Sequence, residues 1–258
     1  MEYFEKIEKK PTDNLEWNIP ERKQSIVNII GGNLQNFSTP AKVAEYLIKS
    51  YPIKTVNLVL PDVLKSKLPP LDNLIFLPST ESGSLMGKKE LTEAINMVDF
   101  NLIIGDLSKN SVTTKAVASA CQNAEKPIIV TRDAVDLITE GQLDRILMNE
   151  NLILMASLAQ LQKVFRTVYY PKVLLLSQSL MQVVEALHKF TLSYPVAIAT
   201  LHGGQILIAR NGKVLAVPLE KTNYSPLSLW NGEVAAKIMA LNLYNPNNFL
   251  KATLVSLF

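Results

Sequence analysis

Short apolar runs alternate with segments of helical periodicity along most of the chain. The runs cover 25–30, 55–60, 74–77, 101–105, 127–131, 152–156 and 196–200. Helical spacing begins near Thr39, where Ser38 or Thr39 is expected to cap a helix, and it returns over 88–98, 111–124, 135–148, 157–168 and 178–192. Continuous apolar runs suit strands that are covered on both faces. The alternation therefore predicts an α/β fold built from βαβ units around a mainly parallel sheet.

The pattern changes after residue 204. Two apolar segments, 205–210 and 213–217, flank Asn211-Gly212, which is a strong signal for a two-residue β-hairpin. A final pair of helices is expected over about 229–243 and 246–257, divided at Asn245-Pro246. Residues 1–24 are polar and lack periodicity, so they predict an N-terminal arm before a single domain over 25–258.

Composition narrows the functional classes. Hydrophobic residues make up 48% of the chain and charged residues 19%, which fits a well-buried core. The net charge of +3 is too small and too dispersed to indicate nucleic-acid binding. No apolar run approaches the roughly 20 residues of a membrane span, and the charged N-terminus is not a signal peptide. The chain is therefore expected to be cytoplasmic.

The single cysteine excludes an intramolecular disulfide. Cys121 falls in the helical segment 111–124, and we expect a buried structural thiol there. His188 also lies in a predicted helix, with no second ligand nearby in the sequence, so a packing or surface role is expected.

In open α/β sheets, ligands bind beyond the carboxyl ends of the strands, so residues that follow strands are candidates. Gly31-Gly32 lacks the spacing of a dinucleotide or phosphate loop and fits a tight turn equally well. Asp106 and Asp133 follow neighbouring runs. They fit magnesium ligands or general bases, and they fit helix caps as well.

Two later segments carry stronger candidates. His202-Gly203-Gly204 follows the run 196–200, where glycines would let the backbone approach a nucleotide or simply form a hairpin turn. Trp230-Asn231-Gly232-Glu233 opens the helix 229–243, where backbone N–H groups can bind an anion. A glutamate in the first turn that stabilises the helix dipole is the alternative.

Taken in order, these segments resemble the ribokinase-like family of ADP/ATP-dependent NAD(P)H-hydrate dehydratases over about residues 20–243. The resemblance rests on IVNIIGG with STPAKVAEYL, DFNLIIGDLSKN, IIVTRDAVDLI, LHGGQILIARNGKV, and Asn223 followed by Gly232-Glu233. Departures from the family accompany these matches. The turn that contacts the nicotinamide has lost its histidine and its acid and reads Met155–Gln160, and the glycine-rich anion loop has become Leu227–Asn231. Glu233 stands where the family has its catalytic aspartate.

The resemblance implies a ribokinase-like three-layer α/β/α sandwich with an antiparallel hairpin near 205–217. It also implies a lyase that uses ADP or ATP with Mg²⁺ to repair hydrated NAD(P)H, with Glu233 as the base and with no residue assigned as a metal ligand. The implied nucleotide-side residues are His202, Gly203, Gly204, Gln205, Ile206, Asn231 and Gly232. The implied substrate-side residues are Gly32, Ala41, Gly105, Asp133, Ser157 and Asn223. The resemblance implies homo-oligomers as well, without nucleic-acid or membrane partners.

Two alternatives remain open at this point. A small-molecule (sugar or vitamin) kinase shares the fold and the helix start. A non-catalytic pseudoenzyme, kept for nucleotide binding or for assembly, accounts for the altered segments 155–160 and 227–233. The alternatives differ in whether segment 227–233 forms an open anion site or has Trp230 filling it, because a filled site disfavours both enzymes.

Overall fold

The computed structural model describes residues 2–11 and 18–258. One sheet runs through the whole molecule in the order β1-β10-β9-β8-β7-β6-β5-β2-β3-β4. Its strands are β1 (Phe4–Lys6), β2 (Gln24–Gly31), β3 (Ile53–Pro61), β4 (Leu74–Leu77), β5 (Phe100–Gly105), β6 (Ile128–Thr131), β7 (Leu152–Met155), β8 (Ala197–His202), β9 (Gln205–Arg210) and β10 (Lys213–Pro218). Every pairing is parallel except those that β9 makes with β8 and β10.

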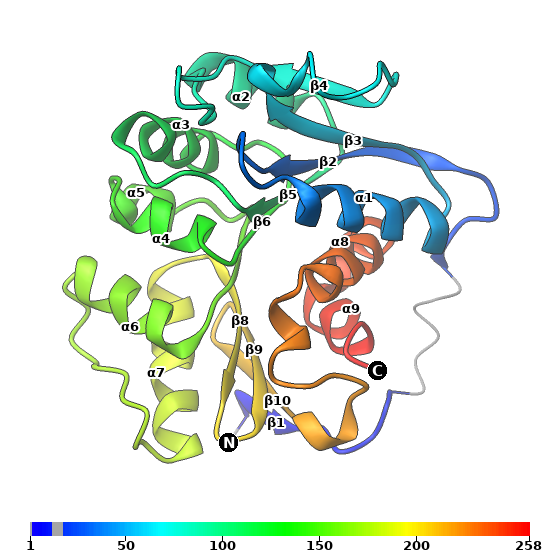
Figure 1. The fold of residues 1–258 in the computed structure, drawn as a ribbon. Coiled ribbons are helices and arrows are strands. Elements are labelled where there is room, and N and C mark those ends of the chain that lie inside the picture. Colours follow the sequence, from blue (N-terminus) through cyan, green and yellow to red (C-terminus); the bar gives the residue numbers. More distant parts are fainter. Residues whose placement is uncertain (1, 12–17) are drawn as a thin grey trace.

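Helices cover both faces of this sheet and make three layers (Figure 1). One face carries α2 (Lys88–Asn96), α3 (Ser111–Gln122), α4 (Ala134–Thr139), α5 (Leu143–Ile146), α6 (Leu158–Thr167) and α7 (Leu180–Ser193). The other face carries α1 (Ser38–Ser50), α8 (Glu233–Tyr244) and α9 (Phe249–Val255). Short 3₁₀ turns are η2 (Asp62–Leu64), η3 (Leu219–Lys221), η4 (Ser228–Trp230) and η5 (Pro246–Asn248). None of the described helices is long and apolar enough to cross a membrane.

Three asparagines, of which Asn28 and Asn101 are fully buried, fix the register of the central strands. Asn28 of β2 pairs in register with Asn57 of β3 and Asn101 of β5. The Asn28 side chain donates to Asn101 Oδ1 at 3.2 Å and accepts from Asn57 Nδ2 at 3.0 Å. A register slip would leave these buried amides unsatisfied, at a cost of about 1–3 kcal/mol each.

The alternation of strands and helices confirms the predicted α/β architecture, and so does the hairpin. Asn211 and Gly212 both have positive φ, 49° and 75°, as a type I′ turn requires. Cys121 is fully buried, and burial raises the pKa of its thiol to about 12. His188 packs its ring on Tyr3 with centroids 3.8 Å apart.

Several local expectations were wrong. The helix expected over 135–148 is divided into α4 and α5, and the helix expected from residue 229 begins at Glu233, after the short turn η4. Neither Ser38 nor Thr39 caps α1, whose N-cap position is Phe37 and has no side-chain hydrogen bond. Within the predicted arm, β1 pairs in parallel with β10 at the sheet edge. Residues 12–17 of that arm lie outside the described part of the chain.

Candidate functional site

The carboxyl ends of β2, β5 and β6 are joined by a chain of hydrogen bonds. The Gly32 N–H donates to the Gly105 carbonyl at 3.0 Å. The Asp106 N–H donates to Asp133 Oδ1 at 2.9 Å. A side chain at Gly105, whose φ is 89°, would collide with Asp133 Oδ1. Glycine is needed at position 105 because the carboxylate lies directly against its backbone.

Neither aspartate caps a helix through its side chain, so the capping interpretation was wrong. Asp133 occupies the N-cap position of α4 but makes no side-chain capping bond there, and Asn110 caps α3. Asp106 is only 9% exposed and receives a hydrogen bond from Arg132 Nη2 at 2.9 Å. The carboxylates tie neighbouring strand ends together instead of ending helices.

Sequence reasoning missed Arg132. It follows β6 directly, and both Arg132 and Asp106 have positive φ, 57° and 56°. Such conformations are strained for residues other than glycine and tend to persist where surrounding contacts fix them. Those contacts include the ion pair itself and the bond from Gln160 Nε2 to the Arg132 carbonyl at 2.7 Å. A basic residue between a strand end and an aspartate was the available signal.

Ser157 joins the same region through α6. Its hydroxyl accepts the Gln160 N–H at 3.3 Å, while Gln160 Oε1 accepts the Ser157 N–H at 3.0 Å, forming a capping box. The structure thus gathers Gly32, Gly105, Asp133 and Ser157 where the parallel strands reach their carboxyl-terminal ends. We call this end of the sheet the carboxyl edge. Ala41 lies on α1, and the Asn223 amide donates to the Phe258 backbone oxygen at 2.6 Å.

The start of α8 is packed tightly against β5 and α1. Gly232 has a φ of 100°, and a Cβ there would collide with Ile104 Cδ1 and come within 2.9 Å of Val43 Cγ2. The Asn231 side-chain oxygen accepts the Glu233 N–H at 2.9 Å. One of the amides that would face an anion at this helix start is therefore already bonded within the chain. The Glu233 residue itself is exposed.

Beside Glu233 lies Tyr224. Burial, followed by the nearby Tyr46 hydroxyl and the Glu233 carboxylate, raises the pKa of Tyr224 to about 12. Its hydroxyl donates to the Ser256 carbonyl at 3.2 Å. Tyr224 thereby connects the segment before α8 to the end of α9.

The β8–β9 turn holds the other nucleotide-side candidates. His202 is 6% exposed, and its Nε2 lies 2.8 Å from the Gln178 carbonyl oxygen, so the ring ties the turn to the segment before α7. The Gly204 carbonyl accepts the Leu219 N–H at 2.9 Å. Gly203 has open space where a side chain would stand, and Gln205 Oε1 is buried with no hydrogen-bond partner among the residues that the structure describes.

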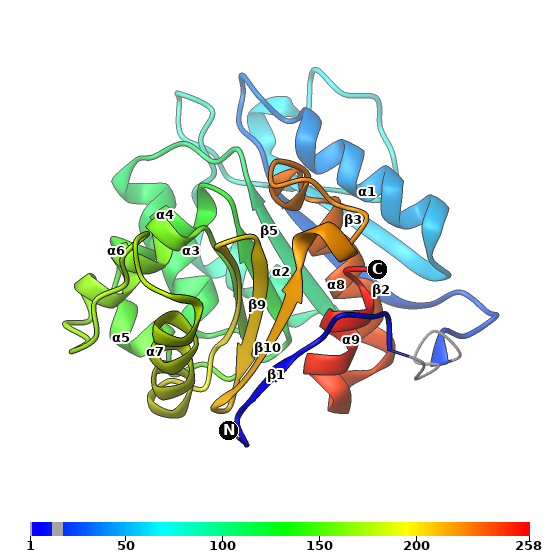
Figure 2. The same cartoon turned by 90° about the horizontal axis from the view of Figure 1, so that it is seen from below.

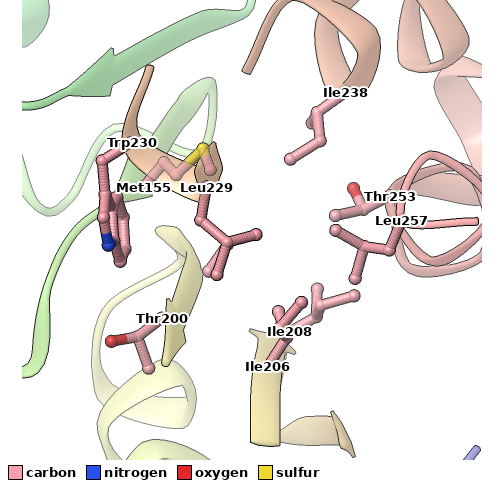
Figure 3. A pocket seen from close by; sticks show the side chains of 10 residues that line it. Met155, Thr200, Ile206, Ile208, Leu229, Trp230, Ile238, Thr253 and Leu257 are labelled. Atoms are coloured by element: carbon pink, nitrogen blue, oxygen red, sulfur yellow. The ribbon is translucent and has the colours of Figure 1, made fainter. Parts of the chain in front are cut away.

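Ile206 lines a small hollow between the sheet and the α8–α9 layer. Its volume is about 10 Å³. Figure 3 shows Leu229 between Met155 and Trp230 on one side and Ile206 and Ile208 on the other. Leu229 is 2% exposed. Ligand sites for drug-sized molecules measure about 300–1,000 Å³, whereas this hollow has room for about one water molecule.

The space beside Ile206 does not fit a nucleotide as it stands. A nucleotide has no room beside Ile206, where Leu229 and Trp230 lie. For Mg²⁺, the described residues contain no group of three or more His, Cys, Asp or Glu side chains placed to hold a metal ion. Asp106 is held by Arg132, and Asp133 by a backbone amide.

No family model matches the chain, and no curated protein matches it. Solved structures do. A ribokinase-like superfamily protein from Enterococcus faecalis aligns with a TM-score of 0.63 at 14% identity, over 99% of this chain and 86% of that one. An ADP/ATP-dependent NAD(P)H-hydrate dehydratase from Bacillus subtilis, co-crystallised with ATP and Mg²⁺, aligns with a TM-score of 0.61 at 14% identity, covering 97% and 86%. A hydroxyethylthiazole kinase from Pyrococcus horikoshii gives 0.58 at 16%, covering 94% and 79%.

These likenesses show the fold. It is ribokinase-like, a mostly parallel sheet flanked by helices, with an antiparallel hairpin formed by β9 and β10. Proteins of this fold include a hydrate dehydratase and small-molecule kinases. Because one fold serves several chemistries, the activity of this chain has to be argued from its own site.

Proposed function

We propose that this chain is a non-catalytic member of the ribokinase-like fold that serves as an assembly protein. The observation that carries the proposal is the hollow of about 10 Å³ beneath Leu229 and Trp230. Of the residues that the resemblance assigns to the nucleotide, Ile206 is the one in the lining of this hollow. A buried leucine cannot be displaced by a phosphate or an adenine without exposing apolar surface, which costs about 25 cal/mol per Å².

Hydrogen bonds within the protein at the carboxyl edge support the same proposal. Phosphoryl transfer depends on backbone N–H groups and cations aimed at the transferred group. Here Asn231 Oδ1 accepts one N–H at the helix start, and the guanidinium of Arg132 is paired with Asp106. Each group holds another part of the protein in place of a ligand.

A divergent NAD(P)H-hydrate dehydratase is the second candidate. The favouring observation is Glu233, which is exposed at the first position of α8, where the resemblance places the base. This activity requires the side chains of Leu229 and Trp230 to move away from Ile206 when a nucleotide binds. A small-molecule kinase requires the same movement and differs in giving a phosphorylated product.

The test is calorimetric titration of the purified protein with ADP and with ATP in the presence of magnesium, followed by hydrated NADH. We expect no binding to the wild-type protein. A double variant, Leu229→Gly with Trp230→Gly, serves as the matched control, because it removes both side chains that fill the hollow. Nucleotide binding by this variant alone would show that these side chains close the site.

The opposite result is equally clear. If wild-type protein bound nucleotide and restored the near-ultraviolet absorbance of NADH, and if Glu233→Gln abolished that recovery, the chain would be a dehydratase. Formation of a phosphorylated small molecule would identify a kinase instead. Either result would overturn the non-catalytic proposal.

An assembly role is supported by an exposed apolar loop between α6 and α7. Tyr169 is 93% exposed, Val173 65% and Leu176 76%. Monomers seldom expose such clusters, so they tend to mark interfaces. Lys172 of this loop lies 3.8 Å from Glu185 of α7, so charged side chains stand beside the apolar ones. We expect a second copy of this chain to cover it.

Sedimentation velocity tests this part. Leu176→Glu is expected to convert an oligomer into a monomer, because it places a charge in the apolar contact. Met97→Glu is the matched control, since Met97, the residue that follows α2, is 78% exposed and lies away from the loop. A monomeric wild-type protein would contradict self-association.

A further inference from the structure

A larger pocket lies at the other end of the strands from the carboxyl edge, which we call the opposite edge. It is bounded by β1, by the hairpin end of β9 and β10, and by the start of α9, which lie side by side in Figure 2. Its volume is about 650 Å³, within the range of about 300–1,000 Å³ typical of small-molecule sites. We call it the hairpin-end pocket. It is separate from every residue assigned above to a nucleotide or a substrate.

Arg210, the last residue of β9, is the central polar group of this pocket. Its guanidinium lies over the Phe249 ring, 4.9 Å from the centroid. Within residues 2–11 and 18–258, its five N–H donors make one hydrogen bond, a long one of 3.4 Å from Nη2 to the Glu150 carbonyl. Burial lowers the pKa of Arg210, partly offset by the Glu150 carboxylate. A half-buried cation with most donors unused is suited to an oxyanion.

The remaining lining supports the same ligand chemistry. Lys213 and Lys251 add basic side chains, and Glu5 is the one acidic side chain among the lining residues. Apolar walls come from Ile7, Leu215, Phe249, Leu250 and Leu254. Apolar walls with a few convergent polar groups are the usual composition of a small-molecule site.

Basic side chains outnumber acidic ones in the lining of the hairpin-end pocket, but not in that of a neighbouring pocket. It has a volume of about 410 Å³ and shares Arg210 and Phe249 with the hairpin-end pocket. Its lining also includes Asp99 and Glu150, which balance Lys126 and Arg210. An anion is therefore favoured on the hairpin side of Arg210 and not on this side.

We propose that the hairpin-end pocket binds a small organic anion. Arg210 and Lys213 hold its phosphate or carboxylate group, and Phe249 and Leu250 contact its apolar body. A bidentate bond from the planar guanidinium fits either oxyanion, and the aromatic ring below fixes the plane of the guanidinium. The site requires no nucleotide at the carboxyl edge, so it stands independently of the proposed function.

The test is calorimetric titration of the full chain with phenyl phosphate and with phenylacetate, using benzyl alcohol as the neutral analogue. Both anions are expected to bind, and benzyl alcohol is not. Tighter binding of phenyl phosphate would identify a phosphate ligand, and tighter binding of phenylacetate a carboxylate. Amide NMR shifts are expected at Asn211 and Gly212, beside the pocket.

Variants locate the site. Arg210→Gln is expected to weaken anion binding about 10- to 100-fold, as the loss of a charged hydrogen bond does. Lys213→Gln is expected to weaken it about 2- to 5-fold, because this lysine is exposed. If Arg210→Gln fails to fold, the Lys213 variant still decides the question. Lys54→Gln, an equal loss of charge on distant β3, is the control and should change nothing.

Four results would overturn the proposal. Equal binding of benzyl alcohol would leave an apolar groove without anion selectivity. Equal effects of Lys54→Gln and Lys213→Gln would reduce the attraction to net charge. Absence of binding by both anions, or shifts confined to other parts of the chain, would remove the site.

Discussion

The two edges of the sheet differ in what their polar groups bind. At the carboxyl edge, Asp106 is paired with Arg132, and Asn231 accepts the Glu233 N–H. At the opposite edge, Arg210 makes a single long hydrogen bond to the described residues and lines a pocket of about 650 Å³. At the first edge the named groups are bonded to other parts of the protein, while at the second Arg210 keeps donors for a ligand.

This difference shows that a chain can keep the topology of a fold while the residues at its usual ligand site change. The solved structures of this fold include proteins named as a dehydratase and kinases, and the present chain keeps their topology at 14–16% identity. Leu229 and Trp230 occupy the space beside Ile206, and under the proposed function the carboxyl edge contributes to stability in place of binding. An opening of the carboxyl edge on nucleotide binding would remove this difference, and the stability contributed by the contacts that close the edge can be measured.

Leu229→Ala is expected to have the largest effect on stability. Leu229 is 2% exposed, so truncation leaves a cavity and should lower the free energy of unfolding by about 2–5 kcal/mol. Leu227→Ala, in the same segment, is the matched control. Leu227 is 86% exposed, so its loss should cost less than about 0.5 kcal/mol. Urea unfolding measures both, and equal effects would mean that Leu229 does not fill the site.

Gly232→Ala is expected to follow. A methyl group would collide with Ile104 and adopt a φ of 100°, so strain and overpacking together should cost about 2–3 kcal/mol. Gly203→Ala provides the comparison. Its φ is also positive, 55°, but nothing lies within 4 Å of the added methyl group. The difference between the two free energies of unfolding isolates the packing at the start of α8, and no difference would show that this helix start is loose.

Asp106→Asn is expected to cost about 1–2 kcal/mol. It removes the charge that pairs with Arg132, which is 26% exposed and therefore partly screened by solvent. Asparagine tolerates the positive φ of this position, so the backbone conformation is kept. Glu45→Gln breaks the exposed pair with Lys49 and should produce no measurable change. A cost for Asp106→Asn as small as for Glu45→Gln would mean that the carboxyl edge is not held by this pair.

Sequence patterns were sufficient for the architecture but not for the site. The hairpin follows from Asn211-Gly212 because only certain residues adopt two consecutive positive φ values. The central strands follow from continuous apolar runs. In contrast, the Asp106–Arg132 pair joins the ends of two strands that are 26 residues apart in the chain, so it depends on their register and on two strained backbone positions.

The filled hollow was beyond sequence reasoning for a similar reason. Leu227 and Leu229 are two residues apart in one loop, yet one is 86% exposed and the other 2%. Hydropathy cannot distinguish them, because the path of η4 over β8 and β9 decides which one is buried. The strand β1 was missed because a strand of three residues is too short for a period to be visible.

Tyr224 offers the mildest test of the closed edge, through pH. Its pKa is raised from about 10 to about 12, chiefly by burial, so the folded state holds this proton more strongly than the unfolded state. The contribution is complete below about pH 10 and is lost as the pH rises toward 12. Tyr224→Phe removes this titration, and the free energy of unfolding should then fall less steeply over that interval. At neutral pH the variant should lose about 0.5–1.5 kcal/mol for the bond to Ser256.

Glu233→Gln should flatten the same alkaline fall slightly, because its carboxylate is the third cause of the shift. Identical alkaline curves for all three proteins would mean that Tyr224 and Glu233 do not face each other, and that the start of α8 is more open than its packing implies.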